Sequence, residues 1–390
     1  MSSSKPVYMM FASQPWNSQH SRTRALTIEL AKQGHHVAYV NLPSSFAGII
    51  RESVASIVYP LRRENVHFRY NAETLEVWSP PTLPTFYRGS LTPGFDRWLF
   101  KAWFEKRLTK IKKPIIAIIV MPYWWDGYIN DYVQSFSATV YDHKDPIGTY
   151  ARSARIHQRM SEVFTELISQ ATGIITHTEA NYRTMLAQRE PLEVCLIRNA
   201  GYDISDKLAG SSTSKKESDR PIIGTVGRIS KNTDVALLLE LADRFPDSSI
   251  VNIGTVIRDA RALRSKKNII LMPPMLHDEL HSNINKFNVG ILPYNTSIEG
   301  SPLRVYDLLS ELLQVVSTKF GDSEYFKDAV HIANDHNEFI TKTSDLLAGK
   351  KNWIPEETIE KFMSANTWKV RAEKLALFCE SLLRQPSAKH

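Results

Sequence analysis

The chain has 390 residues, of which 43% are hydrophobic and 23% charged, which is typical of soluble globular proteins and excludes disordered and collagen-like chains. At roughly 150 residues per domain, this length predicts two or three domains. Lys and Arg outnumber Asp and Glu by 48 to 41. The resulting net charge of +7 favours an anionic partner: a nucleic acid, a phosphorylated small molecule or an anionic membrane.

The cysteine count and the lengths of the apolar runs indicate the cellular compartment in which the protein is expected. Two cysteines, Cys195 and Cys379, make no disulfide framework and indicate a reducing compartment. The amino terminus lacks the long apolar stretch of a secretion signal. The longest nearly apolar run, 114–125, covers 12 residues, fewer than the roughly 20 that span a bilayer. We therefore expect a soluble, cytoplasmic protein.

Short β-rich runs alternate with helical patterns along the first half, which predicts a parallel sheet flanked by helices. The expected strands are 7–11, 37–42, 115–120, 138–141, 173–176 and 193–197, and the expected helices are 23–33, 153–169 and 180–188. Residues 44–113 show no clear pattern, and we expect irregular insertions there.

A polar stretch without periodicity, 207–220, predicts a linker, and the alternation restarts after it. The expected strands are 222–226, 249–253, 268–271, 289–292 and 315–318, with helices at 233–244, 278–285, 302–312 and, amphipathic and long, 367–383. The predicted fold class is α/β, with two Rossmann-like, doubly wound parallel-sheet domains facing a central cleft, since ligands bind beyond the carboxyl ends of such strands.

One segment of the first half is strongly basic. Between Lys101 and Lys113 six positive charges oppose Glu105, and Trp98, Phe100, Trp103 and Phe104 accompany them. Two interpretations stay open: a solvated helix with its aromatic residues in the core, and a peripheral membrane contact over 98–113. In the second, aromatic rings insert and lysines meet anionic lipid.

The segment 294–318 carries the most informative chemistry. Ser301 is a good N-cap and Pro302 a favoured first helical residue, so free N–H groups and the helix dipole could hold a phosphate there. Arg304 adds a positive charge, and the Asp307 carboxylate could accept hydrogen bonds from two vicinal hydroxyls. The alternative is an ordinary capped surface helix.

This segment resembles the nucleotide-sugar signature of GT-B glycosyltransferases, in particular the retaining family four and its relatives. The pattern of that family, two acids separated by seven residues before a strand, is met by Glu299, Asp307 and the run 315–318. The resemblance implies that Glu299 lies near the donor sugar as a catalytic residue and that Asp307 holds the ribose. Asp307 is one methylene shorter than the usual Glu, and the usual Ala-Gly before the strand is replaced by residues 311–313.

Other segments resemble the family in the same order. In the segment 224–231, Gly227 would let the backbone approach the diphosphate, and Arg228 and Lys231 would neutralise its charge. The segment 268–275 would hold the nucleobase through Met275. The segment 290–294 directly precedes the site of the donor sugar. The donor-binding residues implied are Gly227, Arg228, Lys231, Met275, Tyr294, Ser301, Leu303, Arg304 and Asp307. Residues 197–203 resemble the Asn-Gly-Val-Asp motif that closes the first domain, and the last helix, near Trp368, resembles one that crosses back to it.

The resemblance sets the domain limits. It implies an acceptor-binding domain over 1–206, the linker 207–220, a nucleotide-sugar-binding domain over 221–365, and a helix over 366–390 that packs back on the first domain.

The acceptor side offers a charged strand end, 141–146, with the sequence YDHKDP. By resemblance to transferases of bacterial polysaccharide assembly, Asp145 would take the acceptor's hydroxyl proton in an inverting reaction. Asp142 competes for this role, and both could instead be helix caps. His143 and His20 complete the acceptor-side candidates, although an isolated histidine such as His20 is more often structural.

A metal centre has little support. Asp142, His143 and Asp145 are conceivable ligands, but no second acidic or His-x-x-x-His cluster accompanies them. Cationic side chains in the second half already offer charge for a leaving diphosphate. We expect no metal and no cofactor.

Together these features identify the chain as resembling a glycosyltransferase that moves a sugar from a UDP-sugar, or less favourably a GDP-sugar, to a glycan or lipid-linked glycan. The resemblance to teichuronic-acid and exopolysaccharide enzymes implies bacterial surface polysaccharide synthesis, with contact at the inner face of the cell membrane. Inverting and retaining chemistry stay open. The alternatives are a GT-B sugar-nucleotide epimerase and a non-catalytic nucleotide-sugar-binding subunit. A nucleic-acid partner is not expected, because no recognition signature accompanies the charge.

Overall fold

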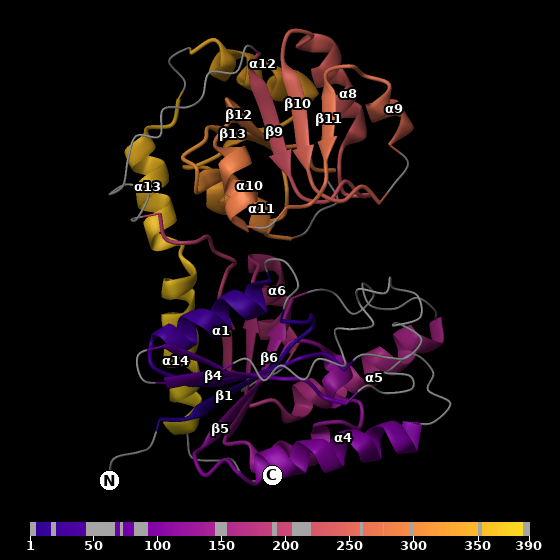
Figure 1. The fold of residues 1–390 in the computed structure, drawn as a ribbon, viewed down its shortest axis with the longest axis vertical. Coiled ribbons are helices and arrows are strands. Elements are labelled where there is room, and N and C mark those ends of the chain that lie inside the picture. Colours follow the sequence, from indigo (N-terminus) through magenta and orange to yellow (C-terminus); the bar gives the residue numbers. More distant parts are fainter. Residues whose placement is uncertain are drawn as a thin grey trace. The chain divides into compact units, whose positions relative to one another are not determined.

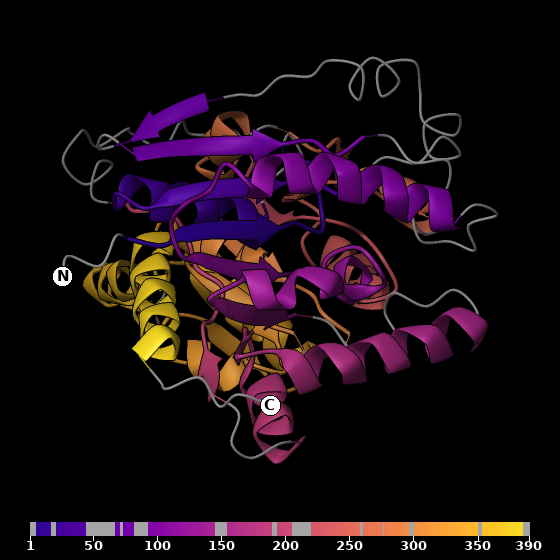
Figure 2. The same ribbon diagram turned by 90° about the horizontal axis from the view of Figure 1, so that it is seen from below.

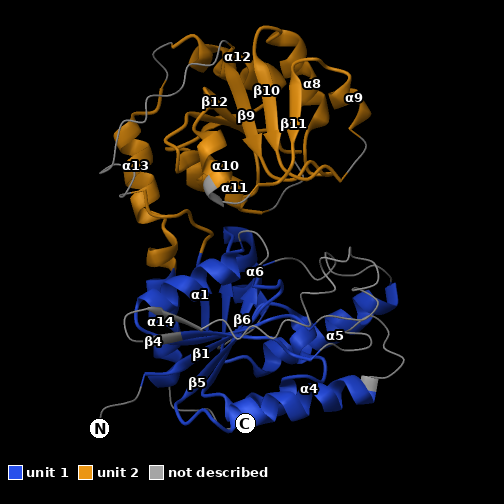
Figure 3. Cartoon of the chain, in the orientation of Figure 1, with its two compact units in different colours: residues 1–197, 372–390 blue, residues 198–371 orange. Residues whose placement is uncertain are grey.

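The computed structural model describes residues 5–16, 21–43, 67–70, 73–81, 93–144, 154–188, 193–204, 220–257, 260–275, 277–295, 300–349 and 353–384. The chain divides into two compact units, one of residues 1–197 with 372–390 and one of residues 198–371 (Figure 3). The sequence interpretation placed these limits at 206 and 365. Most of the expected linker lies outside the described residues.

The first unit contains one sheet, which has eight strands in the part of the chain that the structure describes. Its order is β3-β4-β2-β1-β5-β6-β7-β8, and every pairing is parallel except that of β3 with β4. The strands are β1 (Val7–Phe11), β2 (His36–Val40), β3 (His67–Tyr70), β4 (Glu73–Trp78), β5 (Ile115–Ile119), β6 (Ala138–His143), β7 (Gly173–Thr176) and β8 (Glu193–Leu196). The central strands are apolar and buried throughout, as expected for a sheet covered on both faces.

Helices cover both faces of this sheet (Figure 1). They are α1 (Arg22–Lys32), α4 (Pro93–Leu108), α5 (Ala154–Gln170), α6 (Glu179–Gln188) and α14 (Trp368–Arg384), with 3-10 turns η1 (Pro122–Trp125) and η2 (Asn130–Ser135). On one face Phe104 of α4 meets Phe11 at 5.9 Å between ring centroids. On the other, α14 packs so closely on β7 that a Cβ at Gly173 would lie 2.8 Å from Phe378.

The expectation of irregular insertions over 44–113 was wrong where the structure describes this region. It contains β3, β4 and α4. β4 adds to the parallel sheet beside β2, with Leu75 opposite Val37. α4 forms the outer surface of the first unit at the bottom of Figure 1 and faces the viewer in Figure 2.

The second unit has six parallel strands among the described residues, in the order β11-β10-β9-β12-β13-β14. They are β9 (Ile222–Val226), β10 (Ser249–Ile253), β11 (Ile269–Met272), β12 (Val289–Leu292), β13 (Val315–Thr318) and β14 (His331–Ala333). The order reverses between β9 and β12. In doubly wound sheets the carboxyl ends of the strands at such a reversal form the ligand-binding position.

Two helical layers enclose this second sheet. They comprise α8 (Val235–Arg244), α9 (Arg261–Arg264), α10 (His277–Ile284), α11 (Leu303–Leu309), η4 (Ser323–Phe326), α12 (His336–Leu347) and α13 (Glu356–Ala365). Leu241 of α8 and Phe339 of α12 share one core with Ile291, whereas Val305 of α11 and Met363 of α13 share the other. In neither unit does any described helix combine the length and the apolar character needed to cross a bilayer.

Candidate functional site

The strand reversal of the second unit brings predicted donor residues together. The loop after β9 carries Gly227, Arg228 and Lys231, and the segment after β12 carries Tyr294 and Ser301. Because β9 and β12 are neighbouring parallel strands, both connections leave the sheet at the same edge. The predicted grouping of these residues therefore coincides with the position that the topology favours for a ligand.

Two glycines allow an unusually close backbone approach at this edge. Gly227 has φ 100° and Gly254 has φ 154°, both in the region that favours glycine. A Cβ at Gly254 would lie only 2.2 Å from the carbonyl oxygen of Gly227. The loop after β9 can therefore approach the backbone that follows β10, because no side chain separates the two.

Arg304 reaches from α11 to this loop. One of its terminal nitrogens lies 3.5 Å from the carbonyl oxygen of Arg228, and its guanidinium lies 5.1 Å from the centroid of the Tyr294 ring. A Cβ at Gly227 would be 3.1 Å from the same guanidinium. Arg228 and Lys231 belong to this loop and are exposed. Together with Arg304, they place three cationic side chains along one short stretch of backbone.

The loop is fastened to the connection after β12. The amide of Asp234 donates to the carbonyl of Pro293 at 2.9 Å, and the amide of Asn295 donates to the carbonyl of Asn232 at 3.0 Å. The Tyr294 amide in turn donates to the Thr318 hydroxyl at 2.8 Å, which joins the ends of β12 and β13. These bonds hold the cationic loop in one arrangement.

The start of α11 differs from the sequence interpretation. Pro302 rather than Ser301 is the N-cap; its ψ of 136° is extended, and it makes no side-chain capping bond. The proline ring restricts φ but leaves ψ free, so Pro302 need not enter the helix. The prediction of Ser301 as the N-cap was therefore wrong by one residue, and the phosphate-binding role of this segment stays a prediction.

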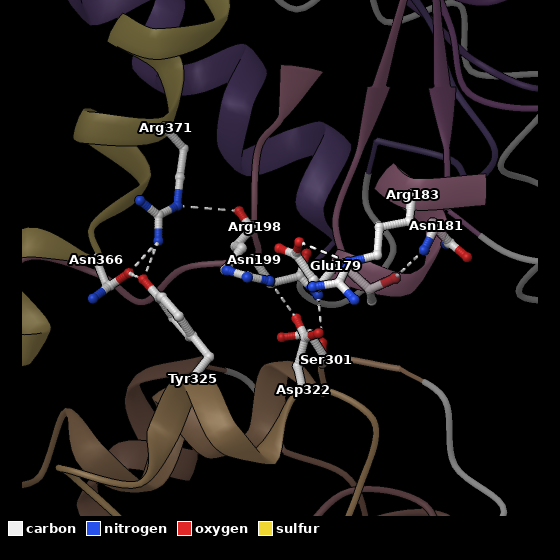
Figure 4. A network of polar contacts seen from close by, with 11 residues as sticks. Glu179, Asn181, Arg183, Arg198, Asn199, Ser301, Asp322, Tyr325, Asn366 and Arg371 are labelled. Atoms are coloured by element: carbon white, nitrogen blue, oxygen red, sulfur yellow. Dashed lines mark hydrogen bonds and ion pairs between the residues drawn. The ribbon is translucent and has the colours of Figure 1, made fainter. Parts of the chain in front are cut away.

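Asn199 anchors this segment instead. Its Nδ2 donates to the carbonyl of Ser301 at 2.7 Å (Figure 4). The adjacent Arg198 pairs with Asp322 at 2.6 Å and lies 4.3 Å from the Tyr325 ring centroid. Sequence reasoning noted the motif at 197–203 but missed this role. The Asn in that motif was the available signal.

Asp307 is half-buried on α11. Burial raises the pKa of its carboxyl to about 6, while the charges of His281 and Arg304 oppose that rise. The group is thus largely ionised at neutral pH and protonated in mild acid. Leu303, one turn earlier, is also half-buried.

A residue in an uncommon backbone conformation follows α11. Leu312 has φ 55°, in the left-handed region that favours glycine. It is one of the three residues, 311–313, that stand before β13 in place of the Ala-Gly of the resembled pattern.

Met275 follows β11 and packs at the margin of the core. Its sulfur accepts from Nδ2 of Asn283, on α10, at 3.4 Å. Glu299, Asp145 and His20 lie outside the described residues, and their roles stay predictions.

The first unit places Asp142, the competing candidate for the catalytic base, in an ion pair. Asp142 is the penultimate residue of β6 and meets Nε of Arg22, the first residue of α1, at 3.1 Å, with the two side chains 1% and 3% exposed. His143 is buried as well, with Nδ1 3.3 Å from the Tyr141 hydroxyl and its ring 5.7 Å from Phe164. These contacts favour a structural role for Asp142 and His143 over a direct role in activating an acceptor.

No group of three or more His, Cys, Asp or Glu side chains among the described residues is arranged to hold a metal ion. The expectation that neither metal nor cofactor is needed stays a prediction.

Comparison with solved structures shows the fold. Sucrose-phosphate synthase from Thermosynechococcus elongatus superimposes with a TM-score of 0.68 at 13% identity, covering 97% of this chain and 99% of that chain. An α,α-trehalose-phosphate synthase (UDP-forming) from Burkholderia vietnamiensis gives 0.64 at 10% identity, over 97% and 99%. Anabaena Alr3699/HepE, in complex with UDP and glucose, gives 0.65 at 12% identity, over 97% and 100%.

These structures have the GT-B fold, and their coverage confirms the predicted fold class: this chain has a GT-B fold. At the level of sequence, no protein-family model matches the chain, and no curated protein matches it.

Proposed function

We propose that this protein is a glycosyltransferase that moves a sugar from a UDP-sugar to a glycan or lipid-linked glycan in bacterial surface polysaccharide synthesis. The observation that carries the proposal is the placement of Arg304 against Gly227 and the carbonyl of Arg228, at the strand reversal of the second unit. It gathers predicted diphosphate-binding residues at the edge where a GT-B sheet is expected to bind its ligand. Structural neighbours whose names mention UDP support this donor over a GDP-sugar.

The chemistry needs a stabilised leaving group. As the bond between the anomeric carbon and the phosphate oxygen breaks, UDP departs with the electron pair, and Arg228, Lys231 and Arg304 stabilise its charge. The acceptor hydroxyl oxygen forms the new bond. Its proton passes to Asp145 if the configuration inverts, or to the departing phosphate if it is retained, with Glu299 beside the sugar.

A membrane contact completes the proposal, with a narrower set of aromatic residues, of which Trp98 was among those first expected. Phe100 and Phe104 are fully buried and cannot insert into lipid. The exposed aromatic pair on α4 is Phe95 and Trp98, at 51% and 62% exposure, with ring centroids 5.8 Å apart. Exposed cations follow toward the end of α4 and just beyond it: Lys106, Lys110, Lys112 and Lys113. Aromatic insertion beside lysines is the chemistry of an anionic membrane surface, here the inner face of the cell membrane.

The proposed reaction is tested by donor binding and acceptor dependence. Purified protein is titrated with UDP-glucose and GDP-mannose, and UDP-sugars are incubated with and without a lipid-linked glycan preparation. We expect UDP-glucose to bind more tightly and UDP release to require the acceptor. Conversion of the sugar nucleotide without acceptor would indicate an epimerase, and binding without either reaction would indicate a non-catalytic subunit.

A further inference from the structure

A buried polar cluster joins α10 to α11 outside the predicted donor set. Nδ1 of His281, on α10, lies 2.6 Å from Oε1 of Glu311 and 3.4 Å from the Ser310 hydroxyl. His281 is 8% exposed, and the Glu311 side chain is 7% exposed. Polar groups this far from water are costly to bury unless they contact one another. The cluster therefore fixes α10 against the end of α11, since Ser310 and Glu311 directly follow its last residue, Leu309.

The same part of α11 carries Asp307. Asp307 and Glu311 are four residues apart on one stretch of chain, and the Ser310 hydroxyl donates to the Asp307 carbonyl at 2.8 Å. His281 lies close enough to Asp307 for its charge to lower the pKa of that carboxyl. Arg304 acts in the same direction from α11 itself, and the buried phenol of Tyr294 lies within reach of the Asp307 charge.

We propose that His281 is a positioning residue for the donor: held by Glu311 and Ser310, it fixes the turn of α11 from which Asp307 binds the ribose hydroxyls of the nucleotide sugar. The inference rests on the proposed function, since it assigns Asp307 a ligand. His281 acts through Asp307 and touches no reacting atom.

The proposal has a consequence for pH. The ionised carboxyl accepts stronger hydrogen bonds from the two hydroxyls than the protonated one, so donor binding weakens as the pH falls through the Asp307 pKa of about 6. Removing the charge of His281 raises that pKa. Without His281, the loss of binding therefore begins at a higher pH.

The test measures UDP-glucose binding by calorimetry between pH 5 and pH 8. UDP-glucose is chosen because its diphosphate is esterified at both ends and lacks the phosphate ionisation near pH 6 that UDP has. H281N removes the charge but keeps an amide nitrogen near the place of Nδ1, able to donate to Glu311. The matched control is H331N, at a half-buried histidine of the same unit whose Nε2 lies 3.1 Å from Oε1 of Gln314.

We expect wild type and H331N to share a midpoint near pH 6 and H281N to move it upward by about one unit, with binding about threefold weaker at pH 6.5. D307N should bind weakly at every pH and lose the transition. An unchanged midpoint in H281N, or a transition that persists in D307N, overturns the positioning role while leaving the donor site intact. Failure of wild type to bind either UDP-glucose or GDP-mannose overturns the proposed function itself, and this inference with it.

Discussion

The two units reverse their strand order in the same way, yet the edges at these reversals carry different chemistry. In the second unit Gly227 follows β9 and lies against Gly254, which follows β10, and Arg304 of α11 reaches the loop after β9. In the first unit the ends of β1 and β5 present aromatic rings: Trp16 and Trp124 are 7% and 0% exposed, and the Trp124 indole donates to the Ala12 carbonyl at 2.9 Å. The topology provides a position for a ligand in each unit, and the side chains decide which ligand can use it.

The candidate carboxylates of the two units, Asp142 and Asp307, also differ in their burial and in their partners. Asp142 pairs with Arg22 and is almost fully buried, whereas the Asp307 carboxyl is half-buried and its pKa is raised by burial to about 6. A buried pair of that kind belongs to the fold, and a half-buried carboxyl beside cations is suited to a ligand.

The largest effect is expected at Asp145. In an inverting enzyme, D145N should reduce sugar transfer to a lipid-linked glycan by about 10²- to 10⁴-fold, because the acceptor hydroxyl loses its base. UDP-glucose binding, measured by calorimetry, should not change. Transfer close to the wild-type rate would contradict the assignment of Asp145 as the base.

Asp142 should matter for folding. D142N leaves the buried guanidinium of Arg22 without its counter-charge and should lower the free energy of unfolding by about 3 kcal/mol in urea titrations. The control is E29Q, which removes the more exposed pair of Glu29 with Lys32, 2.8 Å apart, and should cost about 0.3 kcal/mol. Equal effects for the two variants would show that Asp142 is not a structural residue.

The ionised carboxyl of Asp307 should lower the free energy of unfolding and raise the affinity for the donor. Its pKa is raised in the folded state, so its ionisation costs folding free energy as the pH rises from about 4 to about 6. D307N should therefore unfold at higher urea than wild type at pH 7.5 and at similar urea below pH 4. Its affinity for UDP-glucose should fall about tenfold or more, through loss of a charged hydrogen-bond acceptor. A variant that is less stable at pH 7.5, or that binds normally, would contradict this role.

The smallest effect is expected at the membrane surface. The double variant F95S/W98S should bind anionic phosphatidylglycerol vesicles about tenfold more weakly in sedimentation assays, with unchanged unfolding, since both side chains are exposed. L377S alters another exposed apolar side chain, 68% exposed on α14, and serves as the matched control. Equal loss of vesicle binding in the two proteins would show that α4 is not the contact.

Much of the fold could be predicted because its strands are bounded by strong local signals. Gly227 directly follows β9 and Pro293 directly follows β12, and both strand ranges were predicted correctly. α12 was missed although a signal exists: Asp335 caps it by accepting from the amide of Glu338, three residues on, as in a capping box. The sequence could not show which aromatic residues of α4 are buried and which are exposed, because periodicity alone does not say which side of a helix meets the core.

The grouping of the candidate residues could be predicted where a single segment carries them. Gly227, Arg228 and Lys231 belong to one loop, and their motif is visible in sequence. The role of Asn199 depends on Ser301, and that of Asp142 on Arg22, 120 residues away. Pairings over such separations are made by the tertiary structure, so no local pattern could reveal them.

The central claim is that the loop after β9 and Arg304 hold the diphosphate of the donor. Calorimetric titration of wild type and R304Q with UDP and with uridine tests it directly. We expect R304Q to bind UDP about 10- to 100-fold more weakly, as for the loss of a charge-assisted hydrogen bond, and to bind uridine as wild type does. Unchanged affinity for UDP, or an equal loss for uridine, would contradict the account.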